Sequence, residues 1–172
     1  SEAMHYSFLS AGELDAFDAT DQERRLVLPN PVSADYGVMR DSLLPQLAQS
    51  LGRNFARQVE APALFEIGRV FARGAGGAPA EEERLSIGLG GPFGRGALDR
   101  RRAVDNAEAL LWLKGIVESL CRRLHAGEPV FASAEHPAFE PGWGVSVALA
   151  GGTIGRLGLV RGAIRHAWRM HV

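Results

Sequence analysis

The chain has 172 residues, of which 46% are hydrophobic and 23% charged, and its formal net charge is −1. A chain of this length can bury one sizeable core, and its composition excludes a disordered tail, a collagen-like fibre and a disulfide-stapled miniprotein. No run approaches about 18 consecutive apolar residues, a single cysteine allows no internal disulfide, and the near-neutral charge argues against a domain that binds nucleic acid alone.

The first elements expected along the chain are short. Residues 4–10 alternate weakly in hydropathy, which favours a strand, and residues 13–17 suit one helical turn. Two prolines flank Asn30, so the backbone must turn or run extended there. A short helix is expected over residues 33–39, capped by its first serine.

A long amphipathic helix follows. Asp41 or Ser42 can cap it, and Pro45 is tolerated in its first turn. Apolar side chains at spacings of three and four predict one buried face, made of Leu44, Leu47, Leu51 and Phe55. The opposite, exposed face is predicted to carry Gln46, Gln49, Arg53 and Arg57.

Two strands are expected next. Residues 64–71 are rich in β-formers and bounded by proline and glycine, which is typical of a strand. Glu66 shares a face of that strand with apolar neighbours, so its carboxylate is either paired or at the wet face of the sheet. Residues 73–83 combine glycines with a run of glutamates and suit a flexible hairpin loop before a strand at residues 85–89.

The second half is predicted to contain one long helix and one hairpin. Asp105 and Glu108 fit a capping box at the start of the helix. Residues 128–143 are expected to be mostly loop with a short strand at Val130 and Phe131, followed by a hairpin over residues 145–160 and a helix near residues 161–172. This order favours an α+β fold with a largely antiparallel sheet. We expect one domain over residues 1–172, in the cytoplasm and not in a membrane.

Chemical motifs are weak throughout. A glycine-rich turn at residues 88–91 follows a strand but leads into proline, so a dinucleotide site is not expected. His166 and His171 suit a basic surface better than a metal site, and Cys121 suits an inert core thiol. Arg100–Arg102 suit a solvated loop better than a phosphate contact. We therefore expect no catalytic, cofactor-binding or metal-binding residues in this domain.

Three ordered motifs stand out over residues 5–71. They are His-Tyr-Ser-Phe, then Asn-Pro-x-Ser followed by Met-Arg-x-Ser-Leu-Leu-Pro, and finally Phe-Glu-Ile-Gly-Arg-Val-Phe. The last two contain the residues to which we assign a structural role: Asn30, Pro31, Ser33, Met39, Arg40, Ser42, Leu44, Pro45, Phe65, Glu66, Gly68, Arg69 and Phe71. Together the motifs resemble the beta subunit of bacterial phenylalanyl-tRNA synthetase. A later segment, residues 112–115, is similar to that family's Asp-Leu-Lys-Gly, with Trp112 in place of the aspartate.

The resemblance implies a class II synthetase-like core, which in this subunit is a catalytically silent copy of the alpha subunit's active domain. In active class II domains the corresponding strand leads into Phe-Arg-x-Glu, whose arginine holds the α-phosphate of ATP. Here Phe71 is followed by Ala72. The resemblance therefore implies a domain that is inactive alone, within an assembled enzyme that uses ATP and Mg²⁺ to charge tRNA with phenylalanine.

The expected partner is the alpha subunit, in a heterotetramer, with tRNA bound only through the assembled enzyme. We also expect the chain to self-associate or to pair through a strand edge near residues 4–9. One alternative is a free-standing, synthetase-like paralogue that binds a small ligand or RNA. A self-sufficient ATP-dependent ligase is a weaker alternative, because the phosphate-holding arginine is absent at Ala72.

Overall fold

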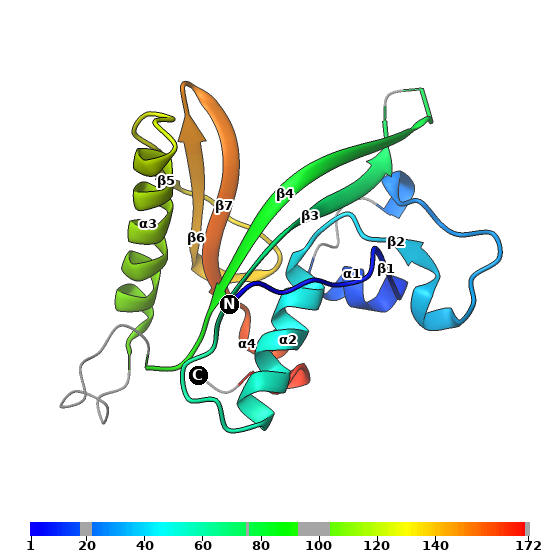
Figure 1. Cartoon of the computed structure of the whole chain (residues 1–172), viewed down its shortest axis with the longest axis horizontal. Helices are drawn as coiled ribbons and strands as arrows, with labels where there is room; N and C mark the ends of the chain where they lie inside the picture. Colours follow the sequence, from blue (N-terminus) through cyan, green and yellow to red (C-terminus); the bar gives the residue numbers. More distant parts are fainter. Residues whose placement is uncertain (18–21, 75, 93–103, 171–172) are drawn as a thin grey trace. The chain divides into compact units, whose positions relative to one another are not determined.

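The computed structural model describes residues 1–17, 22–74, 76–92 and 104–170, and it confirms a mixed α+β fold with antiparallel sheets (Figure 1). The chain divides into two compact units, Ser1–Gly90 with His166–Val172, and Gly91–Arg165. Each unit has its own sheet and helices. The expectation of a single domain over residues 1–172 stays a prediction.

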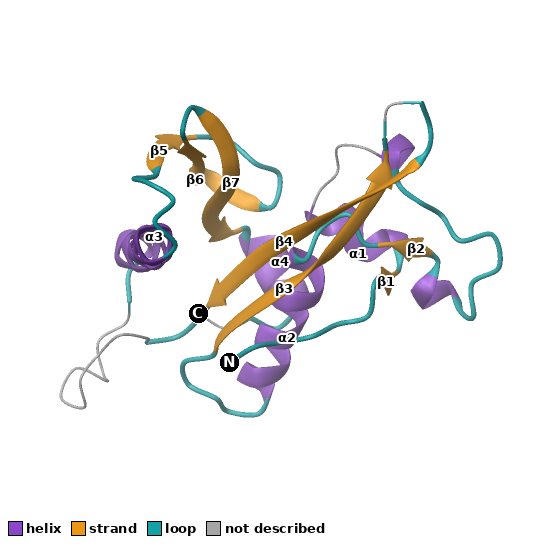
Figure 2. Ribbon diagram, turned by 45° about the horizontal axis from the view of Figure 1, so that its top comes forward, coloured by secondary structure: helices purple, strands orange, loops and turns teal. Residues whose placement is uncertain are grey.

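The first unit is built on a long hairpin with a helix against it. Its elements are β1 (Phe8–Leu9), α1 (Ala11–Phe17), the 3₁₀ turns η1 (Gln22–Arg24) and η2 (Ala34–Tyr36), β2 (Val38–Met39), α2 (Leu44–Ala56), β3 (Ala63–Arg73) and β4 (Pro79–Leu89). β1 pairs with β2 and β3 pairs with β4, both antiparallel. Figure 2 shows α2 crossing the β3–β4 hairpin, against which it packs.

α2 forms because its apolar residues fall on one side, and that side is buried against the hairpin. Leu47 and Leu51 are buried, and Pro45 lies in the first turn as predicted. The close approach of β4 to this helix requires glycine, since a Cβ at Gly88 would lie 2.7 Å from Cδ1 of Leu51. One part of the first unit's core therefore lies between α2 and the hairpin, and another is formed by Leu9, Leu14 and Val38 of β1, α1 and β2.

The N-terminal segment adds to the edge of β3. Glu2 forms a parallel bridge with Phe65, whose carbonyl accepts a 2.7 Å hydrogen bond from the Ala3 N–H. Further along, the Ser7 carbonyl accepts from the Arg40 N–H at 3.0 Å. The segment near residues 4–9 is thus already bound along one side, and pairing of a partner with its edge stays a prediction.

The second unit contains α3 (Asn106–Arg123), β5 (Val130–Ser133), β6 (Phe139–Leu149), β7 (Gly152–Val160) and the first part of α4 (Gly162–Ala167). The strands form one antiparallel sheet in the order β5-β6-β7, and α3 packs against β7. The Asp105 side chain accepts a 2.7 Å hydrogen bond from the Glu108 N–H, which confirms the predicted N-cap. Cys121 is buried, as expected.

Two predicted loops are wrong because strand pairing overrides local composition. Residues 79–83 extend β4, since they pair with residues 69–73 of the long β3, and Arg69 forms a 3.0 Å ion pair with Glu81 across the hairpin. Residues 139–143 likewise belong to β6. The predicted loop run Arg100–Arg102 lies outside the described residues.

Two helix predictions also need correction. Residues 33–39 form the short turn η2 and then β2 instead of a helix, because Val38 and Met39 pair with β1. α2 begins at Leu44, and neither Asp41 nor Ser42 is its N-cap residue. The Ser42 hydroxyl still accepts a 3.2 Å hydrogen bond from the Leu44 N–H, so it satisfies one open donor of the first turn.

Candidate functional site

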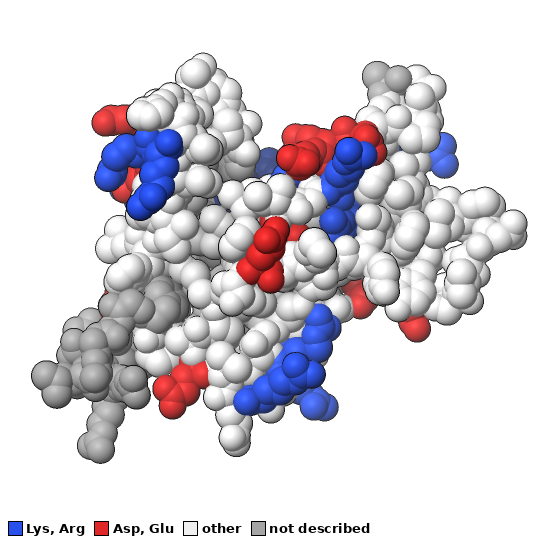
Figure 3. Space-filling view, in the orientation of Figure 1, with Lys and Arg blue, Asp and Glu red and all other residues white. Residues whose placement is uncertain are grey.

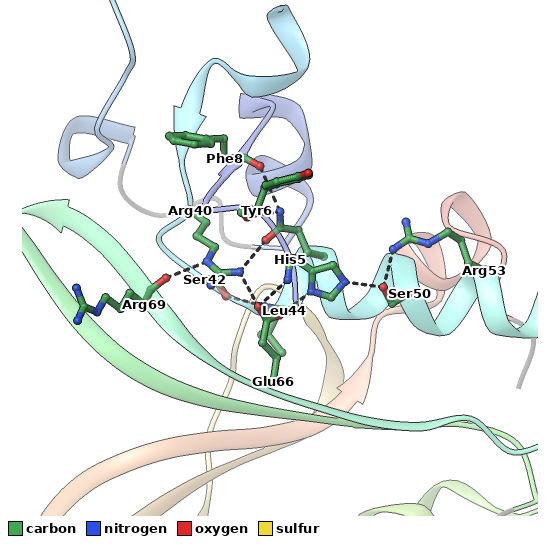
Figure 4. A network of polar contacts seen from close by, with 11 residues as sticks. His5, Tyr6, Phe8, Arg40, Ser42, Leu44, Ser50, Arg53, Glu66 and Arg69 are labelled. Carbon is green, nitrogen blue, oxygen red and sulfur yellow. Dashed lines mark hydrogen bonds and ion pairs between the residues drawn. The ribbon is translucent and has the colours of Figure 1, made fainter. Parts of the chain in front are cut away.

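A buried carboxylate lies at the centre of the first unit's polar interactions. Glu66 on β3 is only 1% exposed. Its Oε1 accepts from Nη1 of Arg40 at 2.7 Å, and its Oε2 lies 2.7 Å from Nδ1 of His5 (Figure 4). The His5 backbone N–H also donates to Oε1 at 3.2 Å. Of the two sequence alternatives for Glu66, pairing is the one the structure shows, as burial of a charge requires.

The buried guanidinium of Arg40 is shared between three acceptors. Besides Glu66, its Nη1 donates to Oε1 of Gln46 at 3.2 Å, and its Nε donates to the Arg69 carbonyl at 2.9 Å. Gly68 makes room for this side chain, because a Cβ there would collide with the guanidinium.

Gln46 connects the same group to the N-terminal segment. Its Nε2 donates to the Tyr6 carbonyl at 2.8 Å and to the Phe8 carbonyl at 3.2 Å. We call His5, Arg40, Gln46, Ser50 and Glu66 the Glu66 cluster. It joins three chain segments that are distant in sequence: the N-terminal strand, α2 with the residues before it, and β3.

Opposing effects act on the pKa of the Glu66 carboxyl. Burial raises this pKa, but hydrogen bonds from His5 and Arg40, together with the positive charge of these groups, outweigh burial and hold it below its ordinary value of 4.5. The carboxyl is therefore ionised at neutral pH, as the ion pair with Arg40 requires.

Ser50, His5 and Glu66 are hydrogen-bonded in the order of a catalytic triad. In such a triad the serine is the nucleophile, the histidine is the base and the carboxylate orients the histidine. Nε2 of His5 lies 2.6 Å from the Ser50 hydroxyl, and Nδ1 faces the carboxylate. However, Ser50 is 9% exposed and also accepts from Nη2 of Arg53 at 2.5 Å. The Ser50 hydroxyl is thus held between His5 and Arg53, and it links α2 to the N-terminal segment.

The structure brings together several of the motif residues singled out in the sequence. Arg40 and Glu66 pair directly, Gly68 and the Arg69 carbonyl lie against Arg40, and the Phe71 N–H donates to the Arg40 carbonyl at 2.8 Å. The remaining residues of the set lie elsewhere or act locally. Asn30 and Pro31 are exposed, Ser33 caps η2, and Met39 pairs with Phe8.

Sequence reasoning missed His5, Gln46 and Ser50. Gln46 was predicted on the exposed face of α2, but it is buried against the N-terminal segment. A signal for it exists, because Gln46, Ser50 and Arg53 fall at helical spacings of four and three and form one polar stripe. His5 carries no such signal, since its partner Glu66 is 61 residues away.

A second location of interest is the hollow beside Ala72, where an active class II strand would present its ATP-holding arginine. It has a volume of about 270 Å³, and its charged lining consists of Arg24, Arg84, Asp41, Glu81 and Glu82. Three carboxylates against two guanidinium groups give this charged lining a formal net charge of −1.

Over residues 1–17, 22–74, 76–92 and 104–170, no three histidine, cysteine, aspartate or glutamate side chains converge as a metal site needs. Within the same ranges, no helix combines the length and apolarity that crossing a membrane requires.

Comparison with known proteins gives one consistent family. The model for the phenylalanyl tRNA synthetase beta chain CLM domain matches residues 1–172. The phenylalanine–tRNA ligase beta subunit of Xylella fastidiosa is 33% identical over 99% of this chain and 21% of its own length. That of Bacillus subtilis is 31% identical over 93% of this chain and 20% of its own length. The chain thus spans about a fifth of these curated relatives.

A solved structure supports the fold independently. The pyrrolysyl-tRNA synthetase PylSc of Desulfitobacterium hafniense matches with a TM-score of 0.64 and 15% identity, over 99% of this chain and 56% of that one. At this identity the likeness shows a synthetase fold and nothing finer.

Proposed function

Because the chain belongs to the phenylalanyl-tRNA synthetase beta chain family, we propose that it is the catalytically silent core domain of a phenylalanine–tRNA ligase beta subunit. In this proposal the domain supports the charging of tRNA with phenylalanine by an assembled cytoplasmic enzyme. The ATP and Mg²⁺ chemistry takes place on the alpha subunit, and tRNA is bound only through the assembly.

The observation that carries this proposal is the set of side chains on and beside β3. Glu66 on this strand is buried in an ion pair with Arg40, which precedes α2, and Ala72 stands at the position where the family resemblance places the phosphate-holding arginine of an active class II domain. Neither Glu66 nor Arg40 can therefore serve a substrate without breaking the core. On the face shown in Figure 3, the basic and acidic side chains of the described residues form small separate groups.

The experiment is co-purification. The full-length subunit that contains this chain is tagged and co-expressed with its alpha subunit, and the captured complex is assayed for tRNA charging. We expect the alpha subunit to be retained and the complex to charge tRNA. A tagged subunit that retains no alpha subunit would contradict the proposal. Binding of tRNA by the chain alone at about 0.15 M salt with sub-micromolar affinity would favour the RNA-binding alternative instead.

A further inference from the structure

Within the Glu66 cluster, the imidazole ring of His5 contacts a carboxylate and a hydroxyl through its two nitrogens. Nδ1 lies 2.7 Å from Oε2 of Glu66, and Nε2 lies 2.6 Å from Oγ of Ser50 (Figure 4). A carboxylate acceptor at Nδ1 keeps the proton of the neutral ring on that nitrogen. The lone pair of Nε2 then faces the Ser50 hydroxyl, which is the arrangement in which a histidine removes a serine proton.

The carboxylate that faces the ring is itself fixed by two further donors. Nη1 of Arg40 and the His5 backbone N–H both donate to Oε1 of Glu66, at 2.7 Å and 3.2 Å. His5 is therefore bound to the same carboxylate through its backbone and through its ring. Fixing a base in this way places it within reach of the hydroxyl before any substrate arrives.

Arg53 supplies a positive charge next to the Ser50 hydroxyl. It follows Ser50 by three residues on α2, and its Nη2 donates to Oγ of Ser50 at 2.5 Å. Figure 4 shows Ser50 between the His5 ring and the Arg53 guanidinium. When a serine attacks a carbonyl group, negative charge develops on the serine oxygen and then on the carbonyl oxygen. A guanidinium at hydrogen-bond distance stabilises that charge.

This chain of contacts runs from the interior of the first unit to its surface. Glu66 is 1% exposed, Ser50 is 9% exposed and the side chain of His5 is 13% exposed, whereas Arg53 is exposed to solvent. A reagent can therefore approach the Ser50 hydroxyl from the side of Arg53. The small exposed area of Ser50 restricts such a reagent to a small acyl group.

We propose that Ser50 is a nucleophile that accepts an acyl group from small, activated carboxylic esters, with His5 as the general base. In this step the bond between Oγ and the acyl carbon forms, and the bond from that carbon to the leaving oxygen breaks. The serine proton passes to Nε2 of His5 and then to the departing oxygen, so atoms and charges balance. This inference does not depend on the proposed function, since every contact it uses lies within the first unit.

A fluorophosphonate probe tests the nucleophile directly, because its phosphorus takes the place of the acyl carbon and fluoride leaves. The full-length protein that contains this chain is treated with the probe, and the labelled residues are identified by peptide mass spectrometry. We expect label on Ser50 and not on Ser10 or Ser42. Both are more exposed than Ser50, but their hydroxyls are hydrogen-bonded to Glu13 and to the Leu44 N–H. A second probe, p-nitrophenyl acetate, should acetylate Ser50 as well.

Three variants separate the roles of the neighbouring side chains. His5→Asn keeps a donor near the position of Nδ1 but lacks Nε2, and it should slow the labelling of Ser50 about a hundredfold or more. Arg53→Gln removes the guanidinium from Oγ and should slow labelling about tenfold or more. Arg57→Gln makes the same change at an exposed position one helical turn later, and it should alter the rate less than about twofold.

The unchanged protein alone can overturn the proposal, by taking no label on Ser50 or by taking label equally on Ser50, Ser10 and Ser42. Labelling of His5→Asn within about twofold of the unchanged rate would also overturn it. Far-UV circular dichroism shows whether each variant is folded. If His5→Asn does not fold, the comparison of Arg53→Gln with Arg57→Gln decides, because both changes are at exposed sites. Equal labelling rates in those two variants would then contradict the proposal.

Discussion

Replacing Glu66 with glutamine tests whether the buried carboxylate holds the first unit together. The change keeps the shape of the side chain but removes the charge that faces Arg40, which is itself only 3% exposed. Removing one partner of a buried ion pair costs about 3–5 kcal/mol, because the other charge stays buried without compensation. This is a large part of the roughly 5–15 kcal/mol that stabilises a typical domain.

Urea unfolding followed by far-UV circular dichroism measures this cost. With a slope of about 2 kcal/mol per molar urea, the midpoint should fall by about 2 M. The matched control is Glu82→Gln on β4, whose 2.8 Å ion pair with Arg84 is exposed and should contribute at most about 1 kcal/mol. Equal shifts of the midpoint in the two variants would refute the reasoning, since burial would then not distinguish the two ion pairs.

Three further predictions follow from the same contacts. The pKa of the Glu66 carboxyl in the folded protein lies below the ordinary value of 4.5. The ionised carboxylate therefore stabilises the fold fully above pH 4.5, and this stabilisation is lost as the pH falls toward and through the folded pKa. The free energy of unfolding should consequently fall less steeply with acid in Glu66→Gln than in the unchanged protein. Gly68→Ala should destabilise by about 1–3 kcal/mol because the new methyl group meets the Arg40 guanidinium, whereas Gly155→Ala, with open space at its Cβ, should change the same unfolding midpoint little. Leu47→Ala should cost about 2–5 kcal/mol because this side chain is 2% exposed, and a melting temperature as high as that of Val32→Ala, a change at a fully exposed site, would show that α2 does not face a core.

Features set by neighbouring residues were predictable from the sequence. The N-cap at Asp105 and the apolar side of α2 depend on spacings of three and four residues, and both are present. The strand over residues 64–71 was predicted from its β-forming residues. Of the predicted buried face of α2, Leu47 and Leu51 are buried, whereas Leu44 and Phe55 are only half-buried. In each case the physical cause lies within one helical turn or one strand.

Features that depend on residues distant along the chain were not predictable from the sequence. Residues 79–83 have the composition of a loop, but the length of β3 gives them a pairing partner. The environment of Glu66 stayed undecided because its partners lie 26 and 61 residues away along the chain. Gln46 was placed on the wrong face because the N-terminal segment that covers it folds back from 38 and 40 residues away.

The central claim is that this domain does not itself activate phenylalanine. Phenylalanine-dependent exchange of pyrophosphate into ATP measures that step directly, with the purified 172-residue chain, the full-length subunit alone and the co-purified complex compared side by side. We expect exchange by the complex only, because the family resemblance places Ala72 at the position of the phosphate-holding arginine of active class II domains. Exchange by the chain alone above a no-enzyme blank would contradict it.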